Sequence, residues 1–264
     1  MSNGPSMVLI GAGNVAHHLG HRLVEQGLTV RQVYSRRMGK ARRLARSLTA
    51  EATKQIDQID PTADLYILAV KDDAIEQLAD QLEKRLAAHK PLIVHTSGAT
   101  PSHIFKGRFK RYGVFYPLQS FSMERDLDFS TVPLCVHANR KADRQLLLRL
   151  GKRLCKNVYL IDDAQRAVLH VAAVFVNNFS NHLFRIGQEI CEAEGLSFDL
   201  LRPLILETAR KVQEHPPAAM QTGPAIRQDE KTLARHLNYL AGSADHQQIY
   251  HIFTQHIRQL PTGD

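Results

Sequence analysis

The chain has 264 residues, of which 44% are hydrophobic and 23% are charged, and its 34 basic and 26 acidic side chains give a net charge of +8. This composition is typical of a globular protein and excludes disordered and collagen-like chains. The length allows one large domain or two smaller ones, and the charge leaves a nucleic acid, a membrane surface or a phosphorylated ligand as partner classes.

Membrane insertion and secretion are not indicated. The sequence has no run of about 18 apolar residues that would predict a transmembrane helix, and residues 1–6 lack the features of a secretory signal. Cys135, Cys155 and Cys191 are widely spaced, and none belongs to a CxxC pair. We therefore expect a cytoplasmic protein with no membrane partner, no disulfide framework and no metal site, and with its cysteines buried as small hydrophobic residues.

Up to residue 162, short apolar runs alternate with amphipathic helical patterns. The runs predict strands at residues 8–11, 30–34, 65–70, 92–95, 113–116, 132–137 and 158–161. Helical patterns cover residues 14–26, 39–48, 73–88 and 141–154. Short apolar strands that alternate with helices are typical of a parallel sheet covered on both faces, so we predict a doubly wound α/β fold of the Rossmann type.

After residue 162 the pattern becomes helical, at residues 164–194, 198–214, 229–241 and 246–260. We therefore predict an α/β domain at residues 1–162 and an all-α domain at residues 163–264. The segment 168–184 is apolar on nearly all sides, and such a helix must be covered by several neighbours. We expect part of that cover to come from a second copy of the chain, and so a homodimer through the C-terminal helices.

The strongest motif is Gly11-Ala12-Gly13-Asn14-Val15-Ala16, which follows the first predicted strand and opens the first predicted helix. This is the setting of the GxGxxG/A dinucleotide fingerprint, in which the first glycine permits a tight turn and the second lets the backbone approach a pyrophosphate. The helix N-terminus offers free N–H groups to that anion. We predict cofactor contacts from Gly11, Ala12, Gly13, Asn14 and Val15, with a plain structural turn as the alternative.

The end of the second predicted strand indicates which dinucleotide binds. Enzymes that use NAD usually place an acidic residue there to bind the ribose 2′-hydroxyl, whereas this chain has Ser35, Arg36 and Arg37, followed by Lys40. These four residues are suited to a 2′-phosphate, which Arg36 can bind through two charge-assisted hydrogen bonds. We therefore predict NADP as the cofactor. Six basic residues between positions 36 and 46 account for six of the eight net charges, so the rest of the chain is close to neutral.

Three histidines follow the glycine-rich turn and superficially suggest a metal cluster. His17 and His21 fall on the side of the predicted helix opposite its apolar residues, and His18 lies beside them. We interpret these histidines as a solvated surface.

These motifs and several that follow resemble one known family, the Rossmann-like NADP oxidoreductases with a helical C-terminal domain of unknown function. Besides the glycine-rich turn, the resemblance rests on Ser35-Arg36-Arg37, Ala69-Val70-Lys71-Asp72-Asp73-Ala74-Ile75, His95-Thr96-Ser97-Gly98, Phe115-Tyr116-Pro117-Leu118-Gln119-Ser120-Phe121, Asn177-Asn178 and Thr222-Gly223-Pro224-Ala225-Ile226-Arg227. The family is similar in fold to pyrroline-5-carboxylate reductases, deazaflavin-dependent NADP reductases and β-hydroxyacid dehydrogenases. The resemblance implies an N-terminal NADP domain and a helical domain that dimerises, and it implies no particular substrate.

Ligands of doubly wound sheets bind beyond the carboxyl ends of the strands. Val70 and Lys71 follow one such strand, and we predict that they contact the cofactor. Ser97 follows the next strand, where related dehydrogenases contact their substrates, so we assign it to cofactor and substrate, with a turn role as the alternative. His95 and Tyr116 end two strands and are candidate proton donors. For His95 the alternative is a hydrogen-bonded structural histidine.

A second set of candidates lies on the long predicted helix. On a wheel of 100° per residue, His170, Asn177 and Asn181 share one face, and Asn178 lies beside them. Buried polar groups need hydrogen-bond partners. We predict a polar wall that faces the nicotinamide and the substrate, and hydrogen bonding between helices is the alternative.

The sequence departs in one respect from the β-hydroxyacid dehydrogenases, which carry a catalytic Lys four residues before the Asn of this helix; that Asn could be Asn177 or Asn178 here. The corresponding residues here are Ala173 and Val174. A hydroxyacid substrate is therefore disfavoured, and an imine becomes the better candidate because an imine that arrives protonated needs less help from the enzyme. His95, Tyr116 and His170 remain alternative proton donors.

The sequence thus predicts an NADPH-dependent oxidoreductase that transfers a hydride to a small carbonyl or imine. The alternative is a non-catalytic NADP(H) sensor or partner-binding protein, which the missing Lys would fit. A nucleic-acid partner is not expected, because the chain shows no helix-turn-helix, zinc or aromatic stacking pattern.

Overall fold

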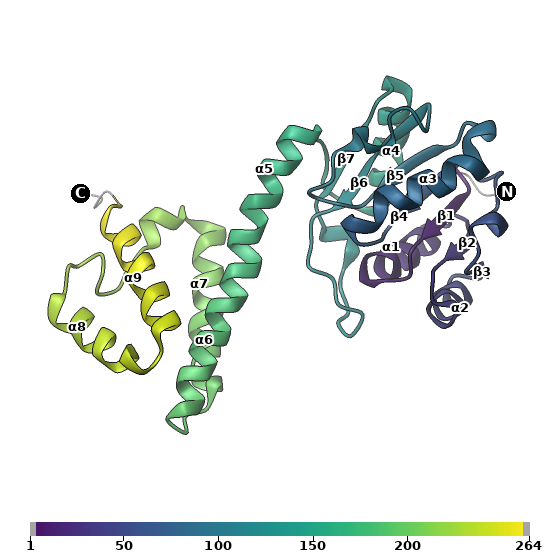
Figure 1. The fold of residues 1–264 in the computed structure, drawn as a ribbon. Coiled ribbons are helices and arrows are strands. Elements are labelled where there is room, and N and C mark those ends of the chain that lie inside the picture. Colours follow the sequence, from purple (N-terminus) through teal and green to yellow (C-terminus); the bar gives the residue numbers. More distant parts are fainter. Residues whose placement is uncertain (1–3, 261–264) are drawn as a thin grey trace. The chain divides into compact units, whose positions relative to one another are not determined.

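The computed structural model describes residues 4–260 (Figure 1). The expectation about the N-terminal segment falls partly on residues 1–3, which lie outside the described residues. Within the described part of the chain, no helix is both long and apolar enough to cross a membrane.

The N-terminal part of the chain is built on one eight-stranded sheet with the strand order β3-β2-β1-β4-β5-β6-β7-β8. The strands are β1 (Met7–Ile10), β2 (Val30–Tyr34), β3 (Glu51–Thr53), β4 (Leu65–Leu68), β5 (Leu92–His95), β6 (Arg111–Pro117), β7 (Leu134–Ala138) and β8 (Val158–Leu160). From β3 to β6 all neighbouring strands are parallel. The order reverses direction between β1 and β4, which is where ligands bind in open sheets of this kind.

Helices cover both faces of the sheet, as the apolar strands require. One core contains alternate strand residues such as Leu9 and Ile67, and α1 (Asn14–Glu25), α2 (Met38–Ser47) and α4 (Lys141–Leu154) contribute to it. The other core contains Val8 and Tyr66, together with α3 (Ile75–Leu86). The predicted Rossmann-type fold is thereby confirmed.

Two features of the sheet differ from the prediction. The short strand β3 was not expected, and its sequence, Glu51-Ala52-Thr53, has no apolar run to indicate it. The last two strands run opposite to the rest, because β6 and β7 pair antiparallel. A parallel connection normally requires a crossover helix, but residues 118–133 contain only one short 3₁₀ turn, η5 (Phe129–Thr131).

The remaining helices are α5 (Asp163–Ala173), α6 (Ser180–Ala193), α7 (Arg202–Glu214), α8 (Glu230–Tyr239) and α9 (Ala244–Arg258) (Figure 1). Between α5 and α6 lies a six-residue π-helix, η6 (Val174–Phe179). The chain divides into two compact units at the Asn177–Asn178 peptide bond, inside η6.

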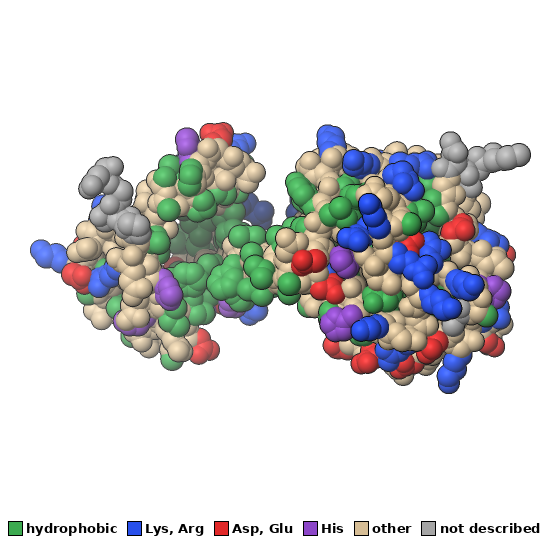
Figure 2. Space-filling model, turned by 90° about the horizontal axis from the view of Figure 1, so that it is seen from above, with side chains coloured by type: hydrophobic (Ala, Val, Ile, Leu, Met, Phe, Trp, Pro, Cys, Tyr) green, Lys and Arg blue, Asp and Glu red, His purple; other side chains and the backbone are tan. Residues whose placement is uncertain are grey.

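The second unit, from Asn178 onward, buries few hydrophobic residues of its own. Among its described residues, the buried ones are Ile186, Cys191, Ala225, Leu233 and Leu240. Large apolar side chains are instead exposed along α6 and α7 and along the end of the first unit, where Val168 is 71% and Val176 is 76% exposed. Figure 2 shows hydrophobic side chains gathered over the helical segments, whereas basic side chains gather on the α/β unit.

Candidate active site

The glycine-rich turn lies at the point where the strand order reverses. Gly11 has a φ of +125°, which favours glycine, and a Cβ there would overlap the Ala69 carbonyl oxygen at the end of β4. Beside Gly13, by contrast, no protein atom lies within 4 Å of the position that a Cβ would take. This open space faces the start of α1, whose first turn has no acidic residue. A pyrophosphate therefore fits the turn sterically and electrostatically.

Two other predicted cofactor residues, Asn14 and Val70, connect this turn with neighbouring segments. The side-chain amide of Asn14 donates a 2.7 Å hydrogen bond to the Phe121 carbonyl, which holds the segment after β6 against α1. Val70 contacts the turn, since its Cγ1 lies 3.2 Å from the Cβ position at Gly11. Ala12 is buried and Val15 is half-buried, while Lys71 is exposed at the end of β4.

The basic residues predicted for the 2′-phosphate lie at the end of β2. The Tyr34 carbonyl accepts a 2.8 Å hydrogen bond from Gly11 N, so the end of β2 lies beside the glycine-rich turn. Arg36, Arg37 and Lys40 are exposed, and Ser35 is half-buried. Helix α2 begins directly after Arg37 and has no acidic residue in its first turn, so this corner offers only positive charge to a phosphate.

Tyr116, His170 and Gly98 converge at the carboxyl edge of the sheet. Tyr116 Oη and His170 Nδ1 are 3.4 Å apart, which is a long hydrogen bond between β6 and α5. Gly98 lies against both rings, because a Cβ on it would come within 2.5 Å of His170 Nδ1 and 2.9 Å of Tyr116 Cζ. Burial raises the pKa of Tyr116, Cys135 and Asp72 raise it further, and the Arg166 charge opposes them. The Tyr116 phenol is therefore protonated at neutral pH.

Ser97 and His95 have structural partners. Ser97 Oγ accepts hydrogen bonds from Ala99 N at 3.2 Å and Thr100 N at 2.9 Å, as in a turn. His95 is two residues after Ile93 on β5, so both side chains lie on the same face of the sheet. They face the core on the α3 side, where the His95 ring packs near Phe105. Burial, reinforced by the Arg166 charge, lowers the pKa of His95 to about 3, so its imidazole is neutral. The turn around Ser97 favours its structural alternative. His95 meets its own alternative only in part, because Nδ1 accepts a 3.2 Å hydrogen bond from Ser97 N, whereas the buried Nε2 has no hydrogen-bond partner in the described part of the chain.

A buried ion pair that the sequence analysis did not predict lies at the start of α5. Arg166 is 1% exposed, and its guanidinium bonds to Asp163 Oδ1 at 2.7 Å, to the Thr100 carbonyl at 2.5 Å and to the Gly98 carbonyl at 3.3 Å. Asp163 Oδ2 accepts two further hydrogen bonds, each 2.8 Å long, from Ser102 N and Oγ. The ion pair itself is local, because its partners are three residues apart, but single-sequence patterns cannot reveal the hydrogen bonds to residues 98–102, which are more than 60 residues away.

The asparagines predicted as a polar wall are exposed, and they lie at the boundary of the two units. Asn177 and Asn178 belong to η6, and Asn181 belongs to the first turn of α6. The 100° wheel that grouped Asn177 and Asn181 with His170 does not apply across this segment, because the π-helix has an i→i+5 hydrogen-bond pattern and a wider turn. The predicted common face is therefore not supported by the helix geometry.

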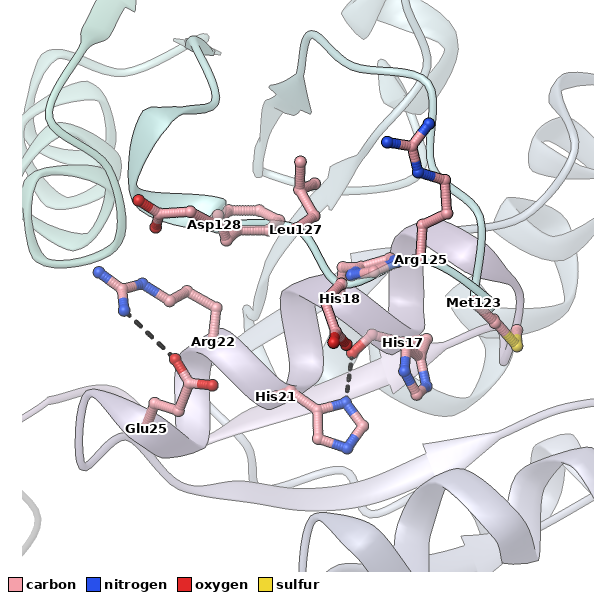
Figure 3. A pocket seen from close by; sticks show the side chains of 11 residues that line it. His17, His18, His21, Arg22, Glu25, Met123, Arg125, Leu127 and Asp128 are labelled. Atoms are coloured by element: carbon pink, nitrogen blue, oxygen red, sulfur yellow. Dashed lines mark hydrogen bonds and ion pairs between the residues drawn. The ribbon is translucent and has the colours of Figure 1, made fainter. Parts of the chain in front are cut away.

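The three histidines after the glycine-rich turn are not simply solvated, as the sequence had suggested. His17, His18 and His21 are half-buried and line a hollow of about 560 Å³ under residues 122–128 (Figure 3). His18 Nε2 lies 2.8 Å from the Ser122 carbonyl. The helical pattern could not show this segment folding back over α1. Within residues 4–260, no three His, Cys, Asp or Glu side chains are grouped so as to hold a metal ion.

This sheet order, with a glycine-rich turn where the order reverses, defines a dinucleotide-binding α/β fold. Family models agree: one described as "NADP oxidoreductase coenzyme F420-dependent" matches residues 6–98, and DUF2520, a domain of unknown function, matches residues 132–257. A "putative NADP oxidoreductase" from Bacteroides fragilis is 39% identical, with a TM-score of 0.92 over 98% of this chain and 100% of that one. The chain therefore belongs to this family of NADP oxidoreductases with a DUF2520 C-terminal domain.

More distant structures share the fold. A protein from Thermotoga maritima is 20% identical, with a TM-score of 0.80 over 96% of this chain and 98% of that one. An imine reductase from Myxococcus stipitatus, in complex with NADP⁺, is 16% identical, with a TM-score of 0.66 over 97% of this chain and 93% of that one. No curated protein sequence matches the chain.

Proposed function

We propose that the protein is an NADPH-dependent reductase that acts on a small carbonyl or imine substrate. The observation that carries the proposal is the convergence of Tyr116 and His170 over Gly98, at the same edge of the sheet as the glycine-rich turn. A half-buried phenol with a hydrogen-bonded imidazole behind it is suited to proton transfer beside a bound nicotinamide.

The predicted cofactor residues fit NADP. The space beside Gly13 and the free N–H groups of α1 suit a pyrophosphate, and Arg36 suits the 2′-phosphate, with Ser35, Arg37 and Lys40 around it. Val70 and Lys71 would lie along the nicotinamide end, because they follow β4 on the other side of the turn. The family description and the NADP⁺ bound by the imine reductase are consistent with this cofactor.

When bound, the reduced nicotinamide supplies the hydride that the substrate carbon accepts. The protein's part is to deliver the proton. Tyr116 Oη gives its proton to the substrate oxygen or nitrogen as the C=O or C=N double bond is reduced, and His170 Nδ1 lies where it can return a proton to the phenolate. The 3.4 Å separation is within the range of catalytic hydrogen bonds that shorten only in the substrate complex.

An imine is the favoured substrate class within this proposal. Ala173 and Val174 stand where β-hydroxyacid dehydrogenases carry their catalytic Lys. Without that cation, proton transfer to the substrate depends on Tyr116 alone, and the nitrogen of a neutral imine, which is more basic than a carbonyl oxygen, accepts the Tyr116 proton more readily. The name of the structurally similar imine reductase points to the same class.

We further propose the division of labour expected from the sequence, in which residues 1–162 bind NADP and residues 163–264 bind substrate and dimerise. The exposed apolar residues of α6 and α7 support a homodimer through these helices, because a monomer would leave them in water. Asn177, Asn178 and Asn181 are then candidates for contacts at the substrate or at the partner. Three buried, unpaired cysteines are consistent with the cytoplasm.

The test is to follow NADPH absorbance with a panel of cyclic imines, 2-oxo acids and aldehydes, and with an oxidised deazaflavin because of the family description. We expect turnover with at least one imine and a loss of about 100-fold in kcat for Tyr116→Phe, which is the middle of the range for a proton donor. Tight NADPH binding without turnover of any substrate would overturn the reductase and favour the alternative, a non-catalytic NADP(H) sensor.

A further inference from the structure

Arg166 is a buried cation with no part in the proposed proton transfer. It is among the largest fully buried side chains of the described chain, and it lies in the first turns of α5. Isolated charges are very costly to bury, so a buried arginine is normally tied to specific partners. The hydrogen-bond partners of Arg166 therefore show which segments it holds in place.

All the acceptors of Arg166 belong to two segments. Within α5 it pairs with Asp163, and across the structure it bonds the carbonyls of Gly98 and Thr100. Asp163 bonds Ser102 in the same loop. The loop from residue 98 to 102 is thus fixed to the start of α5 by a connected set of hydrogen bonds.

This connection bears directly on the proposed proton donor. His170 is four residues after Arg166, so the two side chains leave the same face of α5. The loop that Arg166 bonds carries Gly98, and Gly98 lies against His170 Nδ1 and the Tyr116 ring. A shift of α5 relative to the loop would therefore change the distance between Tyr116 and His170.

We propose that Arg166 is a positioning residue for the Tyr116–His170 pair, and that it sets both the geometry of the pair and the local field at the phenol. The catalytic role of the pair rests on the proposed function, whereas the link between Arg166 and Tyr116 does not. The charged and titratable groups acting on Tyr116 are Cys135 from β7, Asp72 after β4, His170 and Arg166 itself. Among the charged groups, Arg166 is the one that favours the phenolate.

The first measurement needs no substrate. Tyrosinate absorbance is followed during alkaline titration of each protein and of its Tyr116→Phe counterpart, and the difference isolates Tyr116. In Arg166→Gln the midpoint of Tyr116 should move to higher pH, because a nearby positive charge is lost. In Arg166→Lys the charge remains, so the midpoint should stay near that of the wild type.

The second measurement is turnover. In Arg166→Gln we expect kcat to fall about 100-fold, the loss typical of a misplacement near 1 Å, with the Kd for NADPH unchanged. Arg111→Gln is the matched control, because it breaks an arginine pair with a buried carboxylate, Arg111–Asp143, away from the site. It should leave kcat and the Tyr116 midpoint as in the wild type. If Arg166→Gln does not fold, the double variant with Asp163→Asn removes both charges and takes its place.

The outcomes separate the two claims. An unmoved Tyr116 midpoint, with kcat lowered no more than in Arg111→Gln, would overturn the role of Arg166 even if the wild type is an active reductase. A shifted midpoint in a protein that turns over no substrate would uphold the link between Arg166 and Tyr116 and overturn the proposed function.

Discussion

At the scale of single residues, position 98 is one at which the structure requires glycine. Its backbone conformation does not require glycine, but the rings of Tyr116 and His170 leave no room for a side chain. The need for glycine is thus set by close approach and not by a turn. The sequence analysis left Ser97 as either a turn or a site residue, and it could not indicate which neighbours fill the space beside the adjacent Gly98.

Replacing this glycine tests the site directly. Gly98→Ala should push the two rings apart, lower kcat sharply and cost about 1–3 kcal/mol of stability, as overpacking does, while NADPH binding stays unchanged. Gly187→Ala is the control, because the nearest atom to its new Cβ is 3.6 Å away, an ordinary contact. Unchanged turnover in Gly98→Ala would mean that the Tyr116–His170 geometry is unimportant.

At the scale of elements, the first turn of α5 connects the helix to the sheet. Asp162 caps the helix by accepting a 2.8 Å hydrogen bond from Gln165 N. Burial alone would raise the pKa of Asp163, but hydrogen bonds from Arg166 and Ser102 outweigh it and lower the pKa below the usual 3.8. A carboxyl with a lowered pKa stabilises the fold above its unfolded-state pKa, and that stability is lost as the pH falls through the folded-state value.

We therefore predict that Asp163→Asn is about 3 kcal/mol less stable than the wild type near neutral pH, because the substitution leaves Arg166 buried without its anion. The difference should shrink as the pH falls below 3.8, where the Asp163 carboxyl of the unfolded chain becomes protonated, and should be lost once the pH passes the lower pKa of the folded state. Urea unfolding at a series of pH values measures this. A difference that is constant down to the lowest pH would contradict the assigned pairing.

Most helices and strands could be predicted from the sequence, but some could not. Apolar runs located most strands and helices, because burial on both faces leaves a local signature. The antiparallel β7 and the loop that covers His18 depend on long-range contacts, which no local pattern carries. The π-helix η6 was not predicted for another reason. Its residues, Val174 to Phe179, are compatible with an α-helix, and a helical wheel drawn at 100° per residue already assumes that the segment is an α-helix.

At the scale of the whole molecule, the exposed apolar surface of the helical segments is the main feature without an explanation within one chain. Val176, Leu200 and Leu204 are each more than 60% exposed. We predict a homodimer by light scattering, and a shift toward monomer for Leu204→Asp. Val24→Asp places the same charge at an exposed apolar position on α1 and should leave the dimer intact. A monomeric wild type would reject the dimer.

We expect the basic corner after β2 to select NADP through Arg36. Calorimetric titration of the wild type and Arg36→Ala with NADPH and NADH tests it, with Arg42→Ala as a control on the exposed side of α2. We predict that the wild type prefers NADPH by at least about tenfold, and that Arg36→Ala loses about 1.5–3 kcal/mol of NADPH binding but little of NADH binding. Equal wild-type affinities, or a preference that survives in Arg36→Ala, would contradict the account.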